Sequence, residues 1–180
     1  ILEAEVLLRD RDAVLQLERG ALSEGKRQAL SRRVFRSNQI LKARTEQSLS
    51  FVYPQTLPVV GAFEDLSKSI QQHQVTIVCS GTGSGKSTQI PKLCLQLGFG
   101  LVGQIGHTQP RRIAARSVAQ RIASETKSEL GRAIGSQVRF DKTVADQSRL
   151  KVMTDGILLE EIRNDRLLLQ YDVLIIDEVH

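Results

Sequence analysis

The chain has 180 residues, of which 41% are hydrophobic and 25% are charged. These proportions are typical of a globular protein and exclude a wholly disordered, collagen-like or mucin-like chain. No apolar run approaches the roughly 18 residues that a membrane span needs, so we expect a soluble, cytoplasmic protein with no membrane partner. The formal net charge of +5 favours a polyanionic partner without identifying it.

The two cysteines, Cys79 and Cys94, form no CxxC pair, and no cluster of histidines accompanies them. This pattern predicts neither a disulfide framework nor a structural zinc site. We expect both cysteines to be reduced, buried thiols.

The first fifty or so residues show apolar side chains recurring among charges, which predicts helices. Seven basic residues and no acidic ones stand between Gly25 and Thr45, namely Lys26, Arg27, Arg32, Arg33, Arg36, Lys42 and Arg44. This basic run could contact phosphates, or it could be the solvated face of a helix. Pro54 and Pro58 then interrupt any helix. We therefore expect a helical extension at residues 1–52 and a separate domain at residues 53–180.

Beyond the prolines the pattern alternates between strands and helices. We expect helices at residues 62–73, from 86 onward, at 113–126 and at 156–164, and strands at 75–79, 101–107, 137–140, 150–153 and 173–176. Continuous apolar strands such as VTIVC and VLII indicate a parallel sheet that is covered on both faces. The fold class is therefore predicted to be α/β, with helices on both faces of a parallel sheet.

A glycine-rich segment at residues 80–88, SGTGSGKST, lies between an apolar strand pattern and a helical pattern. It contains the final glycine, lysine and serine of the phosphate-loop motif, although Ser80 stands where the first glycine is expected. Glycines let the backbone N–H groups surround phosphate oxygens, and the following helix N-terminus adds partial positive charge. We expect Lys86 to neutralise the β- and γ-phosphates of a nucleotide and Ser87 to place its hydroxyl on Mg²⁺.

The last eight residues, VLIIDEVH, predict a buried strand that ends in two carboxylates. Ligands of open α/β sheets bind at this end of the strands. We expect Asp177 to hold Mg²⁺ through its water shell, and Glu178 to orient and deprotonate an attacking water. Together with a phosphate loop about 90 residues upstream, the pair indicates a nucleotide hydrolase.

Six segments of residues 53–180 occur in an order and spacing that resemble a known family: YPQTLPV, TGSGKSTQIPK, IGHTQPRRIAARSVAQRIA, VRFDK, KVMTDGILLEEI and IIDEVH. They are similar to the amino-terminal part of DEAH-box RNA helicases of the bacterial HrpA type. The chain departs from that family at Val179, where alanine is usual, and at Ser136, where tyrosine usually follows the glycine.

The resemblance implies a RecA-like phosphate-loop domain, incomplete here, in an enzyme that hydrolyses Mg-ATP to move along RNA and unwind it. It implies that the triphosphate is bound by Thr82, Gly83, Ser84, Gly85, Lys86, Ser87 and Thr88. It also implies that Asp177 and Glu178 act in magnesium binding and water activation, and that His180 links the nucleotide state to the rest of the protein.

In similar helicases the TQPRR and TDG segments lie along the RNA backbone, which implies RNA contacts for Arg111, Arg112 and Thr154. Arg121 resembles the arginine that stacks on the adenine. Taken from the residues alone, Arg111 and Arg112 could instead simply begin a surface helix. Backbone contacts also do not distinguish RNA from DNA.

Two other functions are open to the chain. A phosphate-loop kinase is one, but it gives no reason for the TQPRR and TDG segments. A nucleotide- and RNA-binding module without turnover is the other, because the resemblance implies a second RecA-like domain that supplies arginine fingers. The chain begins with Ile1 and stops directly after the acidic pair, so we expect it to be part of a longer protein.

Overall fold

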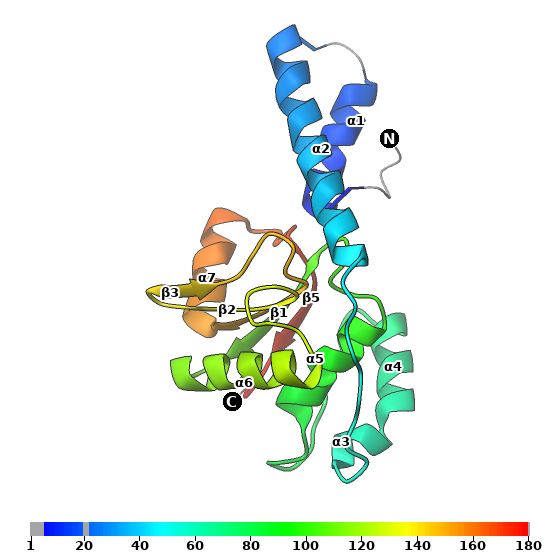
Figure 1. Cartoon of the computed structure of the whole chain (residues 1–180), viewed down its shortest axis with the longest axis vertical. Coiled ribbons are helices and arrows are strands. Elements are labelled where there is room, and N and C mark those ends of the chain that lie inside the picture. The colour runs from blue at the N-terminus through cyan, green and yellow to red at the C-terminus, as the bar shows by residue number, and fades with distance from the viewer. Residues whose placement is uncertain (1–5, 20–21, 180) are drawn as a thin grey trace.

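The computed structural model describes residues 6–19 and 22–179. A sheet with helices on both faces forms the body, and two N-terminal helices project from one end of it (Figure 1). None of the described helices combines the length and the apolar character that a membrane-spanning helix requires.

The projecting part consists of a short 3₁₀ helix η2 (Leu8–Asp10) and the helices α1 (Arg11–Glu18) and α2 (Glu24–Thr45). These helices enclose a small apolar cluster of their own, made by Val6, Ala13, Val14 and Val34. We call residues 6–47, with the gap at 20–21, the arm.

Arg44 fastens the arm to the sheet. Its side chain is buried and donates hydrogen bonds to three carbonyl oxygens, those of Leu101, Gly103 and Asp146, at 2.9, 2.9 and 3.0 Å. The backbone N–H of Leu8 adds a bond to the carbonyl of Val102 at 2.8 Å. The arm is therefore held at the loops that precede the strands.

Residues 48–57, which we call the strap, form no helix or strand and run along the body (Figure 1). They lead into the short helix α3 (Pro58–Gly61), which is followed by α4 (Phe63–Gln72). Pro58 stands at the start of α3, where its missing N–H costs no helical hydrogen bond. The next helix, α5 (Lys86–Gln96), begins at the phosphate-loop lysine, as the sequence predicts.

The sheet has five strands in the order β3-β2-β4-β1-β5. They are β1 (Gln104–Gln109), β2 (Ile134–Val138), β3 (Asp141–Thr143), β4 (Leu150–Thr154) and β5 (Tyr171–Ile176). All neighbouring strands are parallel except β3, which pairs antiparallel with β2 in a hairpin at the edge. The parallel strands therefore end at one common edge.

Helices cover both faces of this sheet. Val152 packs into the cluster formed with α5 and α6 (Arg112–Glu125), whereas its neighbour Met153 packs against α7 (Asp155–Asn164). Adjacent residues of a strand point to opposite faces, so β4 contributes to both layers. The predicted α/β class is confirmed, with the β2–β3 hairpin as its antiparallel part.

Gly106 shows how closely the layer on the α7 face is packed. A Cβ atom at this position in β1 would lie 2.7 Å from a methyl carbon of Leu174 and 2.9 Å from both Met153 and Tyr171. Since such contacts are too short for real side chains, a larger residue here would require these neighbouring side chains to move.

The predicted strand at residues 75–79 is wrong. The segment is extended but joins no ladder, and the side chains of Val75 and Ile77 are 75% and 84% exposed. A strand needs a neighbour that completes its hydrogen bonds, and no described segment lies in that position. For the same reason Cys79 is exposed rather than buried, whereas Cys94 is buried and its pKa is raised to about 12 by that burial.

Candidate functional site

The phosphate loop turns sharply into α5 at Gly85. This residue adopts a left-handed conformation with φ of 94°, which glycine adopts without a steric penalty. A Cβ atom there would also lie 3.0 Å from Leu57, at the end of the strap, and 3.3 Å from Val59 in α3. The backbone N–H of Val59 donates to the carbonyl of Ser84 at 3.2 Å. The end of the strap and α3 thereby support the loop from behind.

The Lys86 ammonium lies inside the loop. It donates to the carbonyl oxygens of Ser80 and Gly81 at 2.6 and 3.1 Å, and to the hydroxyls of Ser80 and Ser84 at 3.0 and 3.3 Å. All four acceptors belong to the loop itself. The positive charge of Lys86 therefore lies at the start of α5, where the partial positive charge of the helix N-terminus also favours an anionic ligand.

Asp177 follows β5 and is the centre of a hydrogen-bonded group. Gln109, the last residue of β1, donates to its carboxylate at 2.6 Å, and the His107 ring nitrogen lies 3.6 Å away. The interaction with His107 is the largest cause that holds the pKa of Asp177 well below its usual range; Ser87 and Gln109 lower it further, and burial opposes them. Asp177 is therefore a carboxylate at neutral pH, beside the hydroxyl of Ser87.

A cleft of about 1130 Å³ lies between the unpaired segment 74–80 and β5, and four of the predicted catalytic and metal-binding residues line it. These are Lys86, Ser87, Asp177 and Glu178. The Glu178 side chain is exposed, and its backbone N–H donates to the carboxylate of Asp177 at 3.0 Å. His180 lies outside the described residues.

The predicted RNA contacts stand at the same edge of the sheet. Thr154 ends β4 and is paired in register with Gln109 at the end of β1. Arg111 and Arg112 follow that strand at the start of α6, and both are exposed. One Arg112 nitrogen donates to the carbonyl of Arg139 at 3.1 Å, which leaves its other donors for a ligand.

Arg121 lies in the second half of α6, and its side chain is exposed. Its guanidinium pairs with Glu125 at 2.9 Å. The other oxygen of Glu125 accepts hydrogen bonds from Lys92, which is fully buried, at 2.8 Å and from Gln89 at 3.0 Å. Gln89 also donates to the hydroxyl of Thr88 at 2.8 Å. Glu125 therefore connects Arg121 to the first turn of the phosphate-loop helix.

We expect Glu125→Gln to lower the free energy of unfolding at pH 7 by about 3 kcal/mol, because the buried Lys92 ammonium loses its countercharge. Burial alone raises the pKa of Glu125, but the bonds from Lys92, Arg121 and Gln89 outweigh it and give a pKa of about 2. A lowered pKa stabilises the fold above the ordinary value of 4.5, and this contribution disappears as pH falls towards 2.

Urea denaturation at pH 7, 4 and 3 checks this expectation. The difference between the wild type and Glu125→Gln should shrink as the pH falls. Glu129→Gln is the matched control, because its side chain is 82% exposed and pairs with Arg132 only at 4.0 Å. Equal stabilities of the wild type and Glu125→Gln at pH 7 would contradict the role of the pair.

Comparison with known proteins places this geometry in a family. No protein-family model matches the chain. It is 59% identical over 128 residues to the ATP-dependent RNA helicase HrpA of Escherichia coli, an alignment that covers 71% of the chain and 10% of that protein. It is 51% identical over 163 residues to the HrpA homolog of Haemophilus influenzae, covering 88% of the chain and 12% of the homolog.

The chain belongs to the HrpA-type DEAH-box RNA helicases. A more distant relative is the probable ATP-dependent RNA helicase DHR1 of Saccharomyces cerevisiae, 41% identical over 160 residues, or 86% of the chain and 12% of that protein. The chain spans about a tenth of the length of these relatives.

In this HrpA-type chain the basic run of the arm divides into two sets. Three of its members have structural contacts: Arg33 pairs with Asp10 and Asp12, Arg36 pairs with Asp146, and Arg44 is buried. The other four, Lys26, Arg27, Arg32 and Lys42, remain exposed. At 100° per residue, Arg27, Arg32 and Lys42 fall within an arc of about 140° and Lys26 lies outside it, so the exposed charges are spread over a broad part of the helix surface.

Sequence reasoning missed three residues of the HrpA-type site. They are His107, Gln109 and Glu125, none of which the motifs single out as a site residue. A signal for the first two was present, because residues two apart in a strand share a face, His107 directly precedes the TQPRR segment and Gln109 is its second residue. Glu125 follows Arg121 by four residues, the spacing of a helical ion pair.

Proposed function

We propose that the protein is an ATP-dependent RNA helicase that binds and hydrolyses Mg-ATP at the carboxyl edge of this sheet in order to move along RNA and unwind it. The observation that carries the proposal is the convergence of Lys86, Ser87, Asp177 and Glu178 on one cleft. The printed names of the relatives, ATP-dependent RNA helicases, support the same activity.

In this proposal the loop residues 82–88 bind the triphosphate of ATP. Lys86 supplies the fixed positive charge for the β- and γ-phosphates, and the backbone N–H groups at the start of α5 bind their oxygens. Arg121 stacks on the adenine, with its guanidinium oriented by Glu125 at 2.9 Å. His180 transmits the nucleotide state to the rest of the protein.

The oxygens of Ser87 and Asp177 fit Mg²⁺, since hydroxyl and carboxylate oxygens are the hard ligands that this ion prefers and Asp177 is ionised. When bound, the ion would neutralise charge on the phosphates. We assign Glu178 as the general base. Its exposed carboxylate follows Asp177 directly and is free to orient a water and accept its proton.

RNA contacts in this proposal are made to backbone phosphates by Arg111 and Arg112, with Thr154 beside them. Guanidinium groups bind phosphates through paired hydrogen bonds and do not read the base. Aromatic residues make up only 4% of the chain and include no tryptophan, which disfavours recognition by base stacking.

We expect the double variant Arg111→Ala/Arg112→Ala to weaken binding of single-stranded RNA by about tenfold at 0.1 M salt. Each neutralised phosphate contributes about −0.7 to the logarithmic salt slope, so the loss of two should make the slope shallower by about 1.4. Fluorescence anisotropy over a salt series measures both. Arg163→Ala/Arg166→Ala, which removes two exposed arginines, one in the last turn of α7 and one just after it, should change neither the affinity nor the slope. An unaltered slope in the first variant would contradict the assignment.

We also propose that residues 1–52 are an extension and that residues 53–180 belong to the first of two RecA-like domains. The separate apolar cluster of the arm supports this division. A second RecA-like domain, with arginine fingers, would lie in the remaining length that the relatives possess. ATP hydrolysis by the chain alone, compared with the full-length protein, distinguishes this proposal from a binding module without turnover, because an arginine finger contributes about 10³ to 10⁵ in rate.

A further inference from the structure

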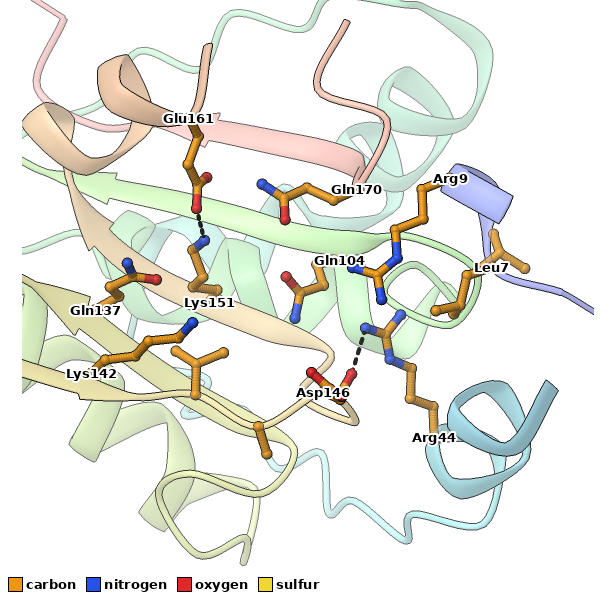
Figure 2. Close-up of a pocket in the computed structure, with 13 residues that line it drawn as sticks. Leu7, Arg9, Arg44, Gln104, Gln137, Lys142, Asp146, Lys151, Glu161 and Gln170 are labelled. Atoms are coloured by element: carbon orange, nitrogen blue, oxygen red, sulfur yellow. Dashed lines mark hydrogen bonds and ion pairs between the residues drawn. The ribbon is translucent and has the colours of Figure 1, made fainter. Parts of the chain in front are cut away.

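A second cavity, of about 160 Å³, lies near the start of β1, away from the end of that strand where Gln109 contacts Asp177 (Figure 2). Gln104, the first residue of β1, and Lys151, near the start of β4, line it. Strands rise about 3.3 Å per residue, so the length of β1 places this cavity roughly 15 Å from the group around Asp177. It is therefore separate from the proposed ATP site.

Four cationic side chains surround the cavity. Arg9 and Arg44 come from the arm, and Lys142 and Lys151 come from β3 and β4. Figure 2 shows the guanidinium groups of Arg9 and Arg44 beside one another, and the ammonium of Lys142 reaching towards Lys151. Like charges repel, so each of these pairs is unfavourable unless an anion lies near it.

Among the described residues, two carboxylates line the same cavity, and both have other partners. Asp146 pairs with Arg36 at 2.5 Å. Glu161 pairs with Lys151 and also accepts a hydrogen bond from the hydroxyl of Tyr171. Arg9 also pairs with Asp10, which lies outside this lining, at 3.6 Å, whereas Arg44 and Lys142 have no ion pair among the described residues.

The burial and hydrogen bonding of Arg44 also favour an anion in this cavity. Its side chain is 3% exposed, and within the described part of the chain no acceptor lies within hydrogen-bonding distance of its Nε atom. Burial, and after it the charge of Arg9, lowers the pKa of Arg44 to about 10. Burial is likewise the first cause that lowers the pKa of Lys151; Glu161 opposes it, and Lys142 adds a smaller lowering. A bound anion would relieve both repulsions.

We propose that this cavity binds a phosphate group, held by Arg9, Arg44 and Lys142 with the side-chain amides of Gln137 and Gln170. The cations approach from two sides, and a tetrahedral phosphate presents oxygens in both directions, whereas a carboxylate presents two oxygens in one plane. The volume corresponds to roughly five waters at about 30 Å³ each, which accommodates one phosphate group with bound water.

A phosphate in this position would join the arm to the sheet, because Arg9 and Arg44 belong to the arm and Lys142 belongs to the sheet. Two sources have the required chemistry: a free phosphate compound and a backbone phosphate of RNA. The site does not depend on the proposed helicase activity, since none of its residues lines the cleft.

Equilibrium dialysis with labelled inorganic phosphate, at constant ionic strength, tests the proposal. The protein used is the full-length protein with Lys86→Ala, so that the phosphate loop does not contribute. We expect about one phosphate bound per chain, and we expect Arg9→Gln and Lys142→Gln each to raise the Kd at least fivefold. Lys26→Gln, which removes an exposed charge from the far end of α2, should leave the Kd unchanged.

Two results would overturn the site. One is that no phosphate binds once Lys86 is replaced; the other is that Arg9→Gln and Lys142→Gln both leave the Kd unaltered. Single-stranded RNA added to the dialysis identifies the source. If it displaces the labelled phosphate, the site binds the RNA backbone, and if the phosphate remains bound, the site takes a free phosphate compound.

Discussion

Replacing Lys86 with alanine is expected to weaken binding of Mg-ATP by about a hundredfold. The ammonium now makes four contacts within the loop, at 2.6 to 3.3 Å, and in the complex it would donate to two phosphates. Hydrogen bonds to charged groups contribute about 1.5 to 3 kcal/mol each, and a hundredfold change corresponds to about 2.7 kcal/mol. Titration calorimetry with a non-hydrolysable ATP analogue measures the change.

The control for this variant is Lys68→Ala, on α4. Lys68 is exposed and pairs only with Glu64, four residues earlier in the same helix, so its removal should leave ATP affinity unchanged. Circular dichroism of both variants checks that the fold is retained. An ATP affinity of Lys86→Ala equal to that of the wild type would remove the phosphate loop from the proposed site.

Glu178→Gln is expected to lower RNA-stimulated ATP hydrolysis by 100-fold or more, with ATP affinity within about threefold of the wild type. A general base contributes about 10² to 10⁴ in rate, and glutamine keeps the shape of the side chain but cannot accept the proton of the water. Because Asp177, rather than Glu178, is the carboxylate beside Ser87, magnesium binding should persist. Steady-state hydrolysis and nucleotide titration, measured on the full-length protein, separate the two effects.

Glu160→Gln, which neutralises an exposed carboxylate on α7, is the matched control and should hydrolyse ATP at the wild-type rate. If Glu178→Gln retains that rate as well, Glu178 is not the general base. A loss of ATP affinity in step with the loss of rate would instead assign Glu178 to nucleotide or metal binding.

The apolar patterns predicted most of the sheet and its helices because they reflect burial. Leu150 and Val152 alternate with side chains on the other face of β4, and α6 carries a buried stripe that includes Ala115 and Ala119. Each of these elements completes its hydrogen bonds within the described chain. Local patterns therefore suffice where the partner of an element is present.

The segment at residues 75–79 has an equally apolar pattern but forms no strand, because a pattern records the tendency to be buried and not the presence of a neighbour. The basic run between Gly25 and Thr45 shows the same limit, because a local pattern does not reveal the partners of its residues. Val34, Ser37, Ile40 and Arg44 are the buried residues of α2 and follow helical spacing, so Arg44 could have been recognised as inward-facing. Its three carbonyl partners belong to distant loops that local spacing does not reveal.

Sequence patterns predicted those parts of the candidate site that lie at the ends of strands. The phosphate loop, Asp177 and Thr154 all stand where parallel strands or their loops meet one edge, and this meeting follows from topology. The carboxylate of Asp177, however, is held by His107 and Gln109 across two neighbouring strands, and that register is a tertiary property.

The rate of ATP hydrolysis by the full-length protein, with and without single-stranded RNA, tests the central claim most directly. If RNA binding by the arginines at the start of α6 is coupled to ATP hydrolysis in the cleft at Lys86 and Asp177, saturating RNA should raise the rate of ATP hydrolysis by the wild type. Arg111→Ala/Arg112→Ala should then need more RNA for the same stimulation. A rate that is identical with and without RNA would contradict the account, because the two sets of residues would share an edge of the sheet without sharing a function.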